Sequence, residues 1–405
     1  MADLQPFRGV RPVEALGQTL CTPPYDVVNT AEARAYAEGN PRSFFHVSRP
    51  EIGLPPGTDE HSDAVHAEGR RNLERFISEG WLRQDDAPCF YLYRQRMGSH
   101  EQTGVVALAR VADYDQGLIR KHELTRSDKE DDRTRHIDTL GGNDEPVFLT
   151  YRAVPSIGAL MAEGTRARPQ YDFTTEDGIG HTFWRVDGTL NARLTAAFHD
   201  VPMLYIADGH HRSAAASRVH SLRSQRGEGG GHGRFLAVVF PHDQMQILAY
   251  NRVVKDLNGL TPEAFLARLC ERFEVSRASS EREDRPHQFG MYLEGGWHQL
   301  TARPGTFGAT PTEALDVSIL QNNVLGALLG IQDPRKDERI QFVGGIRGTA
   351  ELERLVDSGE WRVAFSLHPT SLDQLMAIAD AGEIMPPKST WFEPKLRSGL
   401  VLHLF

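Results

Sequence analysis

Cysteine is scarce in this sequence, with three residues in 405 and no close pair among them. This scarcity excludes a disulfide framework and a zinc cluster built on cysteine, and it is typical of a reducing compartment. The sequence also lacks an apolar run long enough to cross a bilayer, and the N-terminal MADLQPFRGVRP has no apolar signal core. We therefore expect a cytoplasmic protein that does not associate with a membrane.

Positively charged residues are fewer than negatively charged ones, and the formal net charge is −10. This balance argues against a broad nucleic-acid-binding surface, although it is compatible with a local basic pocket. The hydrophobic share of 40% and the charged share of 25% are ordinary for a globular protein. A chain of this length exceeds one simple core, so we expect a catalytic region over residues 1–255 and a second region over residues 256–405.

Both kinds of secondary structure are expected, mixed along the chain. Helices are predicted at residues 59–81, 190–198, 262–273, 314–329 and 372–381. Strands are predicted at residues 43–48, 89–96, 104–111, 146–151, 203–206, 235–241, 245–254, 340–345 and 362–367, with hairpins over 170–186 and 288–302. This alternation predicts an α+β fold with a mixed sheet in the first region and a smaller α+β region after it.

The chain is organised around one stretch, VPMLYIADGHHRSAAAS at Val201–Ser217. An apolar strand is followed by a tight turn and by a run of good helix formers. The turn collects five polar or flexible residues: Asp208, Gly209, His210, His211 and Arg212. Free amides at a helix start favour anions, and the guanidinium of Arg212 suits phosphate. Three roles are open to Asp208, namely helix cap, metal ligand or proton acceptor. The simplest alternative to a functional site is that Asp208 caps the helix and that the two histidines are surface polar residues.

A second cluster lies in RKHELTR, where His122, Glu123 and Arg126 follow the end of a predicted strand. A glutamate beside histidine and arginine is a candidate general base or metal ligand. The alternative is a surface ion-pair network. Ser127 and Glu130 come next and predict a capping box at the start of a charged helix.

Two proline-rich segments complete the set of candidates. LCTPPYDVVNT carries Tyr25 and Asp26 on a rigid loop, which is either a structural turn or the wall of a substrate pocket. IMPPKSTWFEPKLRSG, residues 384–399, carries Lys388 and Lys395. This strap either ties down the last strand or brings cations to a site.

Four motifs, PPYDVV, RKHELTR with KEDDR, YIADGHHR and MPPKSTWFEPKL, together resemble the family filed as domain of unknown function 1015. The Asp-Gly-His-His-Arg turn is similar to that of the ParB and sulfiredoxin superfamily, which includes free-serine kinases and CTP-hydrolysing partition proteins. The resemblance implies a ParB/sulfiredoxin-like core with an added C-terminal region. It also implies that Asp208–Arg212 bind nucleotide phosphates and that a glutamate acts as base, for which we choose Glu123.

The function expected from these observations is transfer of a phosphoryl group from a nucleotide or polyphosphate to a small hydroxyl compound, with L-serine as the first candidate. Lys388 and Lys395 would neutralise phosphate charge, Tyr25, Asp26 and Arg126 would contact substrate, and Asp208 and His122 are rival catalytic groups. Magnesium is expected with the nucleotide. Two alternatives remain: a nucleotide-dependent switch without turnover, and a metal-dependent hydrolase built on Asp208, His210 and His211.

Overall fold

The computed structural model describes residues 1–186, 188–278 and 285–405, and the chain divides into two compact units. Unit 1 comprises Met1–Met245 together with Pro394–Phe405, and unit 2 comprises Gln246–Glu393. The boundary thus falls earlier than the expected residue 255. In addition, the residues from Pro394 onward belong to unit 1, whereas the sequence assigns them to the C-terminal region.

Unit 1 is built on a sheet of nine described strands in the order β6-β11-β8-β12-β5-β4-β10-β9, with β1 also paired to β5. The strands are β1 (Leu4–Gln5), β4 (Tyr91–Met97), β5 (His100–Arg110), β6 (Ile119–Arg120), β8 (Val147–Tyr151), β9 (Tyr171–Thr174), β10 (Gly180–Arg185), β11 (Leu204–Asp208) and β12 (Arg234–Pro241). β11 is parallel to β6 and β12 is parallel to β8, and the other pairings are antiparallel. The predicted α+β fold with a mixed sheet is therefore confirmed.

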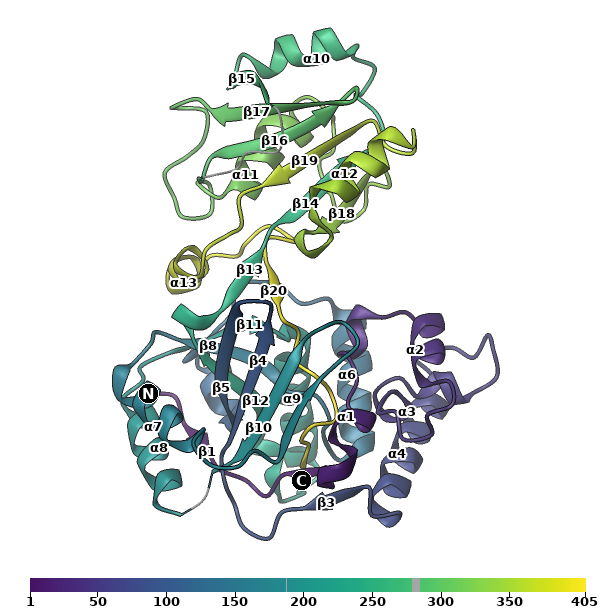
Figure 1. Ribbon diagram of the computed structural model, residues 1–405, viewed down its shortest axis with the longest axis vertical. Helices are drawn as coiled ribbons and strands as arrows, with labels where there is room; N and C mark the ends of the chain where they lie inside the picture. The colour runs from purple at the N-terminus through teal and green to yellow at the C-terminus, as the bar shows by residue number, and fades with distance from the viewer. Residues whose placement is uncertain (187, 279–284) are drawn as a thin grey trace. The chain divides into compact units, whose positions relative to one another are not determined.

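The helices of unit 1 pack on one another beside this sheet (Figure 1). They are α1 (Gly17–Leu20), α2 (Thr30–Ala37), α3 (Phe45–Ser48), α4 (Asp63–Ser78), α5 (Val111–Asp115), α6 (Ser127–Leu140), α7 (Pro155–Gly164), α8 (Thr189–His199) and α9 (His210–Gln225). α6 packs on α9, and α7 packs on α8. Leu160 of α7 and Phe198 of α8 join Leu149 and Val239 of the sheet in the main core. Among the described residues, no helix is both long and apolar enough to span a membrane.

The C-terminal segment is built into unit 1. β21 (His403–Leu404) pairs with β7 (Gly142–Asn143), close to the ribbon formed by β2 (Val10–Pro12) and β3 (Leu82–Gln84). Leu402 is fully buried and forms a bridge with Val10. The last residues of the chain therefore complete a core that begins with its first residues.

Unit 2 contains an antiparallel sheet in the order β15-β17-β16-β19-β14-β18. Its strands are β14 (Tyr250–Val254), β15 (Phe273–Ala278), β16 (Gln288–Leu293), β17 (Gly296–Ala302), β18 (Ile340–Gly344) and β19 (Val363–Leu367). Its helices are α10 (Pro262–Leu269), α11 (Asp316–Leu320), α12 (Gly348–Asp357) and α13 (Leu372–Asp380). A separate ribbon pairs β13 (Gln246–Leu248) with β20 (Trp391–Glu393).

Several local predictions were wrong. Residues 43–48 do not form a strand, because Phe45–Ser48 is helical and a short apolar run fits either structure. Residues 245–254 form two strands, β13 and β14, which separate at Ala249 and join different partners. The helix predicted at 314–329 becomes π-helical over Gln321–Gly326. α6 begins at Ser127, but Arg126 occupies the cap position, and the Glu130 carboxylate accepts a bond from Thr125 instead of closing a capping box.

Candidate functional site

The polar turn at Asp208–Arg212 connects β11 to α9, as the sequence predicts. Gly209 caps the helix with a φ of 95°, in the left-handed region that a side chain would strain. A Cβ at this position would also lie 3.1 Å from Nε of Arg212. α9 starts at His210, so the unsatisfied amides of its first turn lie directly after the strand.

Asp208 does not cap α9. One carboxylate oxygen accepts a bond from the Gly209 amide at 2.8 Å, and the other lies 2.9 Å from Nζ of Lys395. Burial opposes ionisation of Asp208, but Lys395 and Arg212 outweigh it and hold the pKa of this carboxyl below its usual range. Asp208 is therefore an ionised anchor for the Lys395 ammonium, and it is a poor proton acceptor at neutral pH.

Arg212 is buried at the first turn of α9. Nη1 donates to the Pro146 carbonyl, and Nη2 lies 4.0 Å from the Asp208 carboxylate. Burial lowers the pKa of Arg212, but carboxylates led by Asp26 and Asp208 raise it by more, so the guanidinium stays charged. The turn thus holds one buried cation whose orientation is fixed by a backbone carbonyl.

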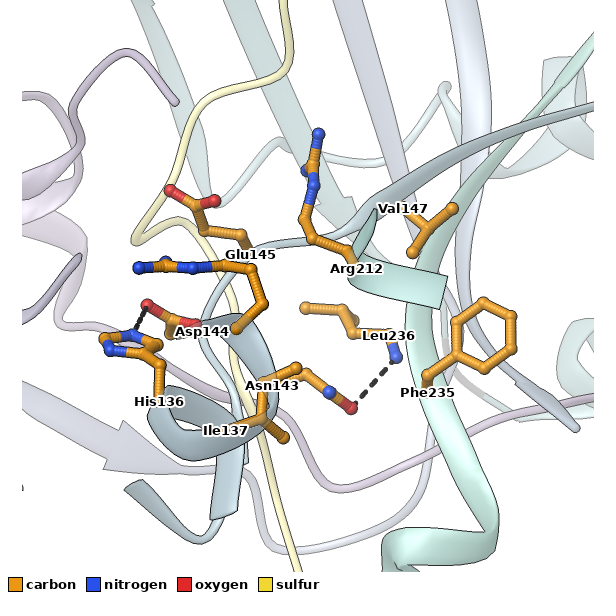
Figure 2. Close-up of a pocket in the computed structure, with 10 residues that line it drawn as sticks. His136, Ile137, Asn143, Asp144, Glu145, Val147, Arg212, Phe235 and Leu236 are labelled. Carbon is orange, nitrogen blue, oxygen red and sulfur yellow. Dashed lines mark hydrogen bonds and ion pairs between the residues drawn. The ribbon is translucent and has the colours of Figure 1, made fainter. Parts of the chain in front are cut away.

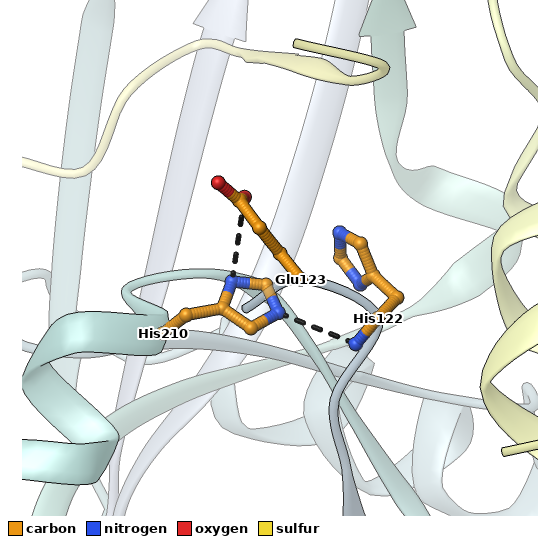
Figure 3. Close-up of side chains that lie close together, drawn as sticks. All are labelled: His122, Glu123 and His210. Atoms are coloured by element: carbon orange, nitrogen blue, oxygen red, sulfur yellow. Dashed lines mark hydrogen bonds and ion pairs between the residues drawn. The ribbon is translucent and has the colours of Figure 1, made fainter. Parts of the chain in front are cut away.

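His122, Glu123 and His210 converge beside this turn (Figure 3). One ligand atom from each lies within 4.8 Å of the other two. The His122 amide donates to Nε2 of His210 at 3.5 Å, and a Glu123 oxygen lies 4.0 Å from Nδ1 of His210. Burial lowers the pKa of His122 to about 4, and burial with His122 nearby lowers that of His210. Neutral imidazoles and a carboxylate are a donor set for borderline metals such as zinc.

Exposure separates the two neighbouring candidates His122 and Glu123. His122 is 2% exposed, and its ring packs edge-on against His210 with 4.5 Å between centroids. The side chain of Glu123 is 44% exposed. A substrate in solution can therefore reach the Glu123 carboxylate, whereas the His122 imidazole lies inside the protein.

Arg126 lies at the edge of this group. Its amide donates to Nε2 of His211 at 3.1 Å, while its guanidinium pairs with Asp128 at 2.7 Å and its side chain is 70% exposed. Burial lowers the pKa of His211, which is half-buried. The Arg126 backbone therefore fixes the imidazole of His211, and its side chain extends into solvent.

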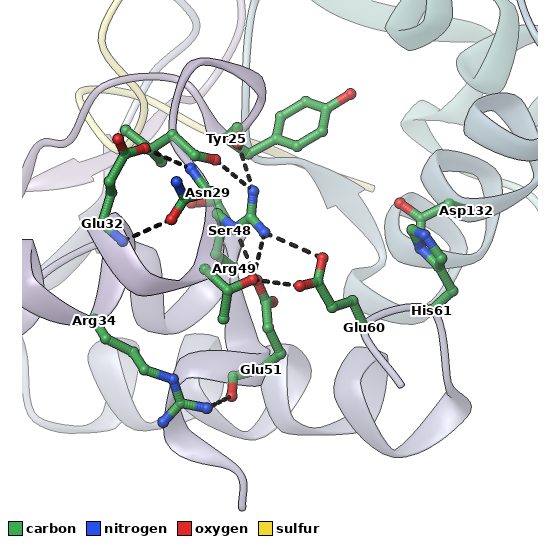
Figure 4. A network of polar contacts seen from close by, with 12 residues as sticks. Tyr25, Asn29, Glu32, Arg34, Ser48, Arg49, Glu51, Glu60, His61 and Asp132 are labelled. Atoms are coloured by element: carbon green, nitrogen blue, oxygen red, sulfur yellow. Dashed lines mark hydrogen bonds and ion pairs between the residues drawn. The ribbon is translucent and has the colours of Figure 1, made fainter. Parts of the chain in front are cut away.

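The loop that carries Tyr25 and Asp26 is held on two sides. Figure 4 shows the Arg49 guanidinium donating to the Tyr25 carbonyl at 3.0 Å within a wider polar network. The Tyr25 amide donates to Glu145 at 3.0 Å, and the Arg133 guanidinium stacks 4.0 Å from the Tyr25 ring centroid. The Tyr25 ring is therefore partly buried and stacked on Arg133, whereas Asp26 is exposed.

A small pocket opens behind the turn and is lined by both charge signs (Figure 2). Its lining includes Arg133, Asp144, Glu145 and Arg212. Glu145 accepts bonds through Oε1 from the Tyr25 amide and from the Ser398 hydroxyl, while its buried Oε2 has no partner among the described residues. Burial and the Asp144 carboxylate raise the pKa of Glu145 to about 7.

A family model described as "Protein of unknown function (DUF1015)" matches residues 4–318, which is well over half of the chain. The chain belongs to the DUF1015 family. The family predicted from the four sequence motifs is therefore confirmed. No curated protein matches this DUF1015 chain.

Solved structures similar to the DUF1015 chain include a free serine kinase in complex with AMP, at 15% identity and a TM-score of 0.34, covering 73% of this chain and 92% of that one. SbnI with a C-terminal truncation, from Staphylococcus aureus, is 13% identical with a TM-score of 0.39, covering 74% and 87%. A conserved hypothetical protein from Pyrococcus furiosus is 13% identical with a TM-score of 0.33, covering 73% and 95%. These scores are too low to support an argument about function.

Most of the site residues predicted for this DUF1015 chain belong to unit 1. They are Tyr25, Asp26, His122, Glu123, Arg126, Asp208, Gly209, His210, His211, Arg212 and Lys395. Lys388 belongs to unit 2, where its carbonyl accepts a bond from Arg252 at 3.0 Å. The two lysines of the strap therefore have different surroundings, although they are only seven positions apart in the sequence.

Sequence reasoning missed Arg133, Asp144 and Glu145 in the DUF1015 chain. Asp144 and Glu145 stand directly before Pro146, whose carbonyl holds Arg212, and before the buried strand β8 that pairs with β11. An acidic pair at the entry to a fully buried strand was the available signal. Its meaning depends on the pairing of β8 with β11, which the sequence does not specify.

Proposed function

We propose that this protein transfers a phosphoryl group from a nucleotide or polyphosphate to a small hydroxyl compound, with L-serine as the first candidate acceptor. One observation carries the proposal: the half-exposed Glu123 carboxylate lies 4.0 Å from His210, at the start of the helix that holds Arg212. Phosphoryl transfer requires mainly positioning and charge neutralisation, with a base that orients the attacking hydroxyl. The proposal assigns the base to Glu123 and the charge neutralisation to the turn at Asp208–Arg212.

In this proposal the phosphates bind at the first turn of α9. The amides after Gly209 and the positive end of the helix dipole favour a phosphate there. Lys395, fixed by Asp208, and Arg212, fixed by Pro146, supply charge without having to reorganise when the ligand arrives. His210 and His211 line the same turn as hydrogen-bonding groups.

The acceptor would bind between Glu123 and the loop that carries Asp26. Glu123 would take the proton of the acceptor hydroxyl as its oxygen attacks the terminal phosphorus. The bond from that phosphorus to the bridging oxygen of the donor breaks, and the shortened nucleotide or phosphate leaves. The exposed Asp26 carboxylate, which is the acid with the largest influence on the charge of Arg212, suits a substrate ammonium or a magnesium ion carried by the nucleotide. Tyr25 would position this loop through its backbone, and Arg126 would contact substrate at the rim.

The experiment is a turnover assay with ADP, ATP and pyrophosphate as donors and L-serine as acceptor, on the parent protein and on Glu123→Gln. General-base assistance contributes about a hundredfold to ten-thousandfold, so we expect turnover to fall by at least about a hundredfold. Donor affinity measured by calorimetry should stay within about threefold, because the proposal assigns phosphate binding to the helix amides, Arg212 and Lys395 and not to Glu123. Asp131→Asn, an exposed carboxylate of α6 that pairs with Arg218, is the matched control and should keep full turnover.

His122→Ala distinguishes the rival base. A dead His122→Ala variant beside an active Glu123→Gln variant would contradict the assignment of Glu123. Donor binding with no turnover on any acceptor would favour the alternative, a nucleotide-dependent switch.

A metal-dependent hydrolase is the second candidate, and one observation favours it. The ligand atoms of His122, Glu123 and His210 lie within 4.8 Å of one another. This ligand set differs from the set expected from the sequence, which used His211 beside His210. Nε2 of His211 instead accepts a bond from the Arg126 amide. The test measures metal content after dialysis and hydrolysis of a phosphate ester. Retained zinc or manganese in the parent, with both the metal and the hydrolysis lost in His210→Ala, would support the hydrolase over the transferase.

A further inference from the structure

Unit 2 contains a buried arginine whose charge is not balanced. Arg252 lies in β14 between Phe342 of β18 and Phe365 of β19, and it is 3% exposed. Nη2 donates to the Lys388 carbonyl at 3.0 Å. Nη1 is buried and has no hydrogen-bond partner within the described part of the chain. An arginine is seldom buried in the interior of a sheet unless it is paired.

No carboxylate among the described residues compensates Arg252. Burial lowers the pKa of its guanidinium to about 9, and the group that opposes this shift is the phenol of Tyr250. The buried arginines of unit 1 differ, because carboxylates raise the pKa of both Arg133 and Arg212. A buried cation without a counter-ion is unfavourable, and an oxyanion is the partner that a guanidinium pairs with best.

A second cation lies beside the same aromatic rings. Tyr250 and Arg252 are two positions apart on β14 and therefore face the same side of the sheet. The Arg252 guanidinium lies 5.1 Å from the Phe342 ring centroid, and Nζ of Lys388 lies 5.4 Å from that of Tyr250. The Tyr250 and Phe342 rings are themselves 5.9 Å apart. Both cations thus border one aromatic cluster.

The backbone at Lys388 is held in an unusual conformation. Its φ of 58° lies in the left-handed region, which residues with a side chain seldom adopt. The Arg252 bond to the Lys388 carbonyl supports this conformation, and Ser389 donates to the Pro386 carbonyl at 2.6 Å across the same turn. A sparsely populated backbone conformation that its surroundings hold in place is typical of ligand-binding segments.

We propose that Arg252 and Lys388 form a binding site in unit 2 for a small molecule that carries an oxyanion, either a phosphate or a carboxylate. Arg252 supplies the buried end of the site, Lys388 supplies the solvent end, and Tyr250 and Phe342 form an apolar wall. This site does not depend on the proposed transferase activity, which uses residues of unit 1.

Crystals of the full chain soaked in sodium selenate test the location directly. An anomalous selenium peak in contact with both Arg252 and Lys388 is the expected result. Well-occupied selenate elsewhere, with no peak at these two residues, overturns the proposal.

Calorimetry on the full chain tests the same site in solution, with inorganic phosphate and malonate as separate probes. Lys388→Gln should weaken the unit 2 binding event of at least one probe about tenfold or more, and Arg252→Met should abolish that event. The probe affected identifies phosphate or carboxylate. Arg362→Gln, an exposed arginine of unit 2 paired with Glu294, is the control and should bind as the parent does. Since Arg252 is buried, Lys388→Gln decides the question if Arg252→Met does not fold.

The outcome is separable from that of the transferase proposal. Arg212→Lys should leave this binding unchanged while it weakens the phosphate site of unit 1. The proposal for unit 2 is overturned if Lys388→Gln binds both probes as the parent does. It is also overturned if Arg212→Lys is the only variant that loses binding of the probes.

Discussion

The ammonium of Lys395 lies 2.9 Å from the carboxylate of Asp208, although 187 positions separate the two residues. The contact joins the C-terminal strap to the end of β11, and both side chains are less than a third exposed. Such a pair does more than add stability, because it fixes the position of a cation at the start of α9. The consequence of the pair for stability can be measured, and the neighbouring Arg212 gives a separate prediction about ligand binding.

In stability, Asp208→Asn and Lys395→Gln should not be additive. Contacting charges that share a network couple measurably, and we expect a coupling of about 1 kcal/mol in the free energy of unfolding. Urea unfolding of the parent, the two single variants and the double variant measures this coupling. Additivity within about 0.3 kcal/mol would show that the ion pair makes no net contribution.

In ligand binding, Arg212→Lys should weaken pyrophosphate affinity at least about tenfold, although the charge is kept. Lysine cannot reproduce the planar fork, and it cannot hold Pro146 and a phosphate at once. Calorimetry with pyrophosphate measures the effect. Arg218→Lys on the same helix is the matched control, because that side chain is more exposed and pairs with Asp131. Equal affinity of both variants and the parent would exclude Arg212 from the phosphate site.

Gly209→Ala should destabilise the protein by about 1–3 kcal/mol, because its left-handed φ is strained for a residue with a Cβ. The new methyl group also meets the Arg212 guanidinium, so pyrophosphate affinity should fall in the same variant. Gly158→Ala is the contrasting control. Gly158 lies in α7 with open space around it, so Gly158→Ala should raise the free energy of unfolding by up to about 1 kcal/mol. Thermal unfolding of both variants checks the pair.

Glu145 should make the protein less stable as the pH rises. Its pKa of about 7 in the folded protein exceeds the ordinary value of about 4.3, so the folded state keeps a proton that the unfolded state has lost. Stability contributed by this group is therefore present below pH 4.3 and declines up to pH 7, by as much as about 4 kcal/mol. Glu145→Gln keeps the bonds from Tyr25 and Ser398 and should remove this decline.

The measurement is urea unfolding of the parent and of Glu145→Gln at pH 5 and pH 8. The free energy of unfolding of the variant should rise relative to that of the parent at the higher pH. Equal pH dependence in the two proteins would mean that the Glu145 carboxyl titrates as it does in solution.

Local signals in the sequence predicted much of the fold. The hairpins at 170–186 and 288–302 follow from turn residues between alternating strands, and the polar turn after β11 follows from an abrupt change in polarity. The mixed sheet was predictable as a class, whereas the strand order depends on pairings between distant segments.

The site was predictable as a list of residues but not as an arrangement. Lys388 and Lys395 look equivalent in the sequence, yet Lys395 pairs with Asp208 in unit 1 and Lys388 packs beside Tyr250 in unit 2. Glu145 was missed because its raised pKa arises mainly from burial, and the visible acidic pair Asp144–Glu145 does not indicate that burial until β8 is paired with β11. Arg252 was missed for the same reason, since its unbalanced charge is visible only once the surrounding strands are in place.

The return of the C-terminal segment to unit 1 has a consequence for how the chain folds as it is synthesised. A ribosome that has translated as far as Glu393 has made every residue of unit 2 but has not yet made Lys395, Leu402 or β21 of unit 1. Domains commonly fold in order from the N-terminus during translation. Here the order is inverted, because the domain that begins first is the last to have its complete sequence. A stop codon in place of the Pro394 codon would therefore spare unit 2 and remove the cation that Asp208 holds.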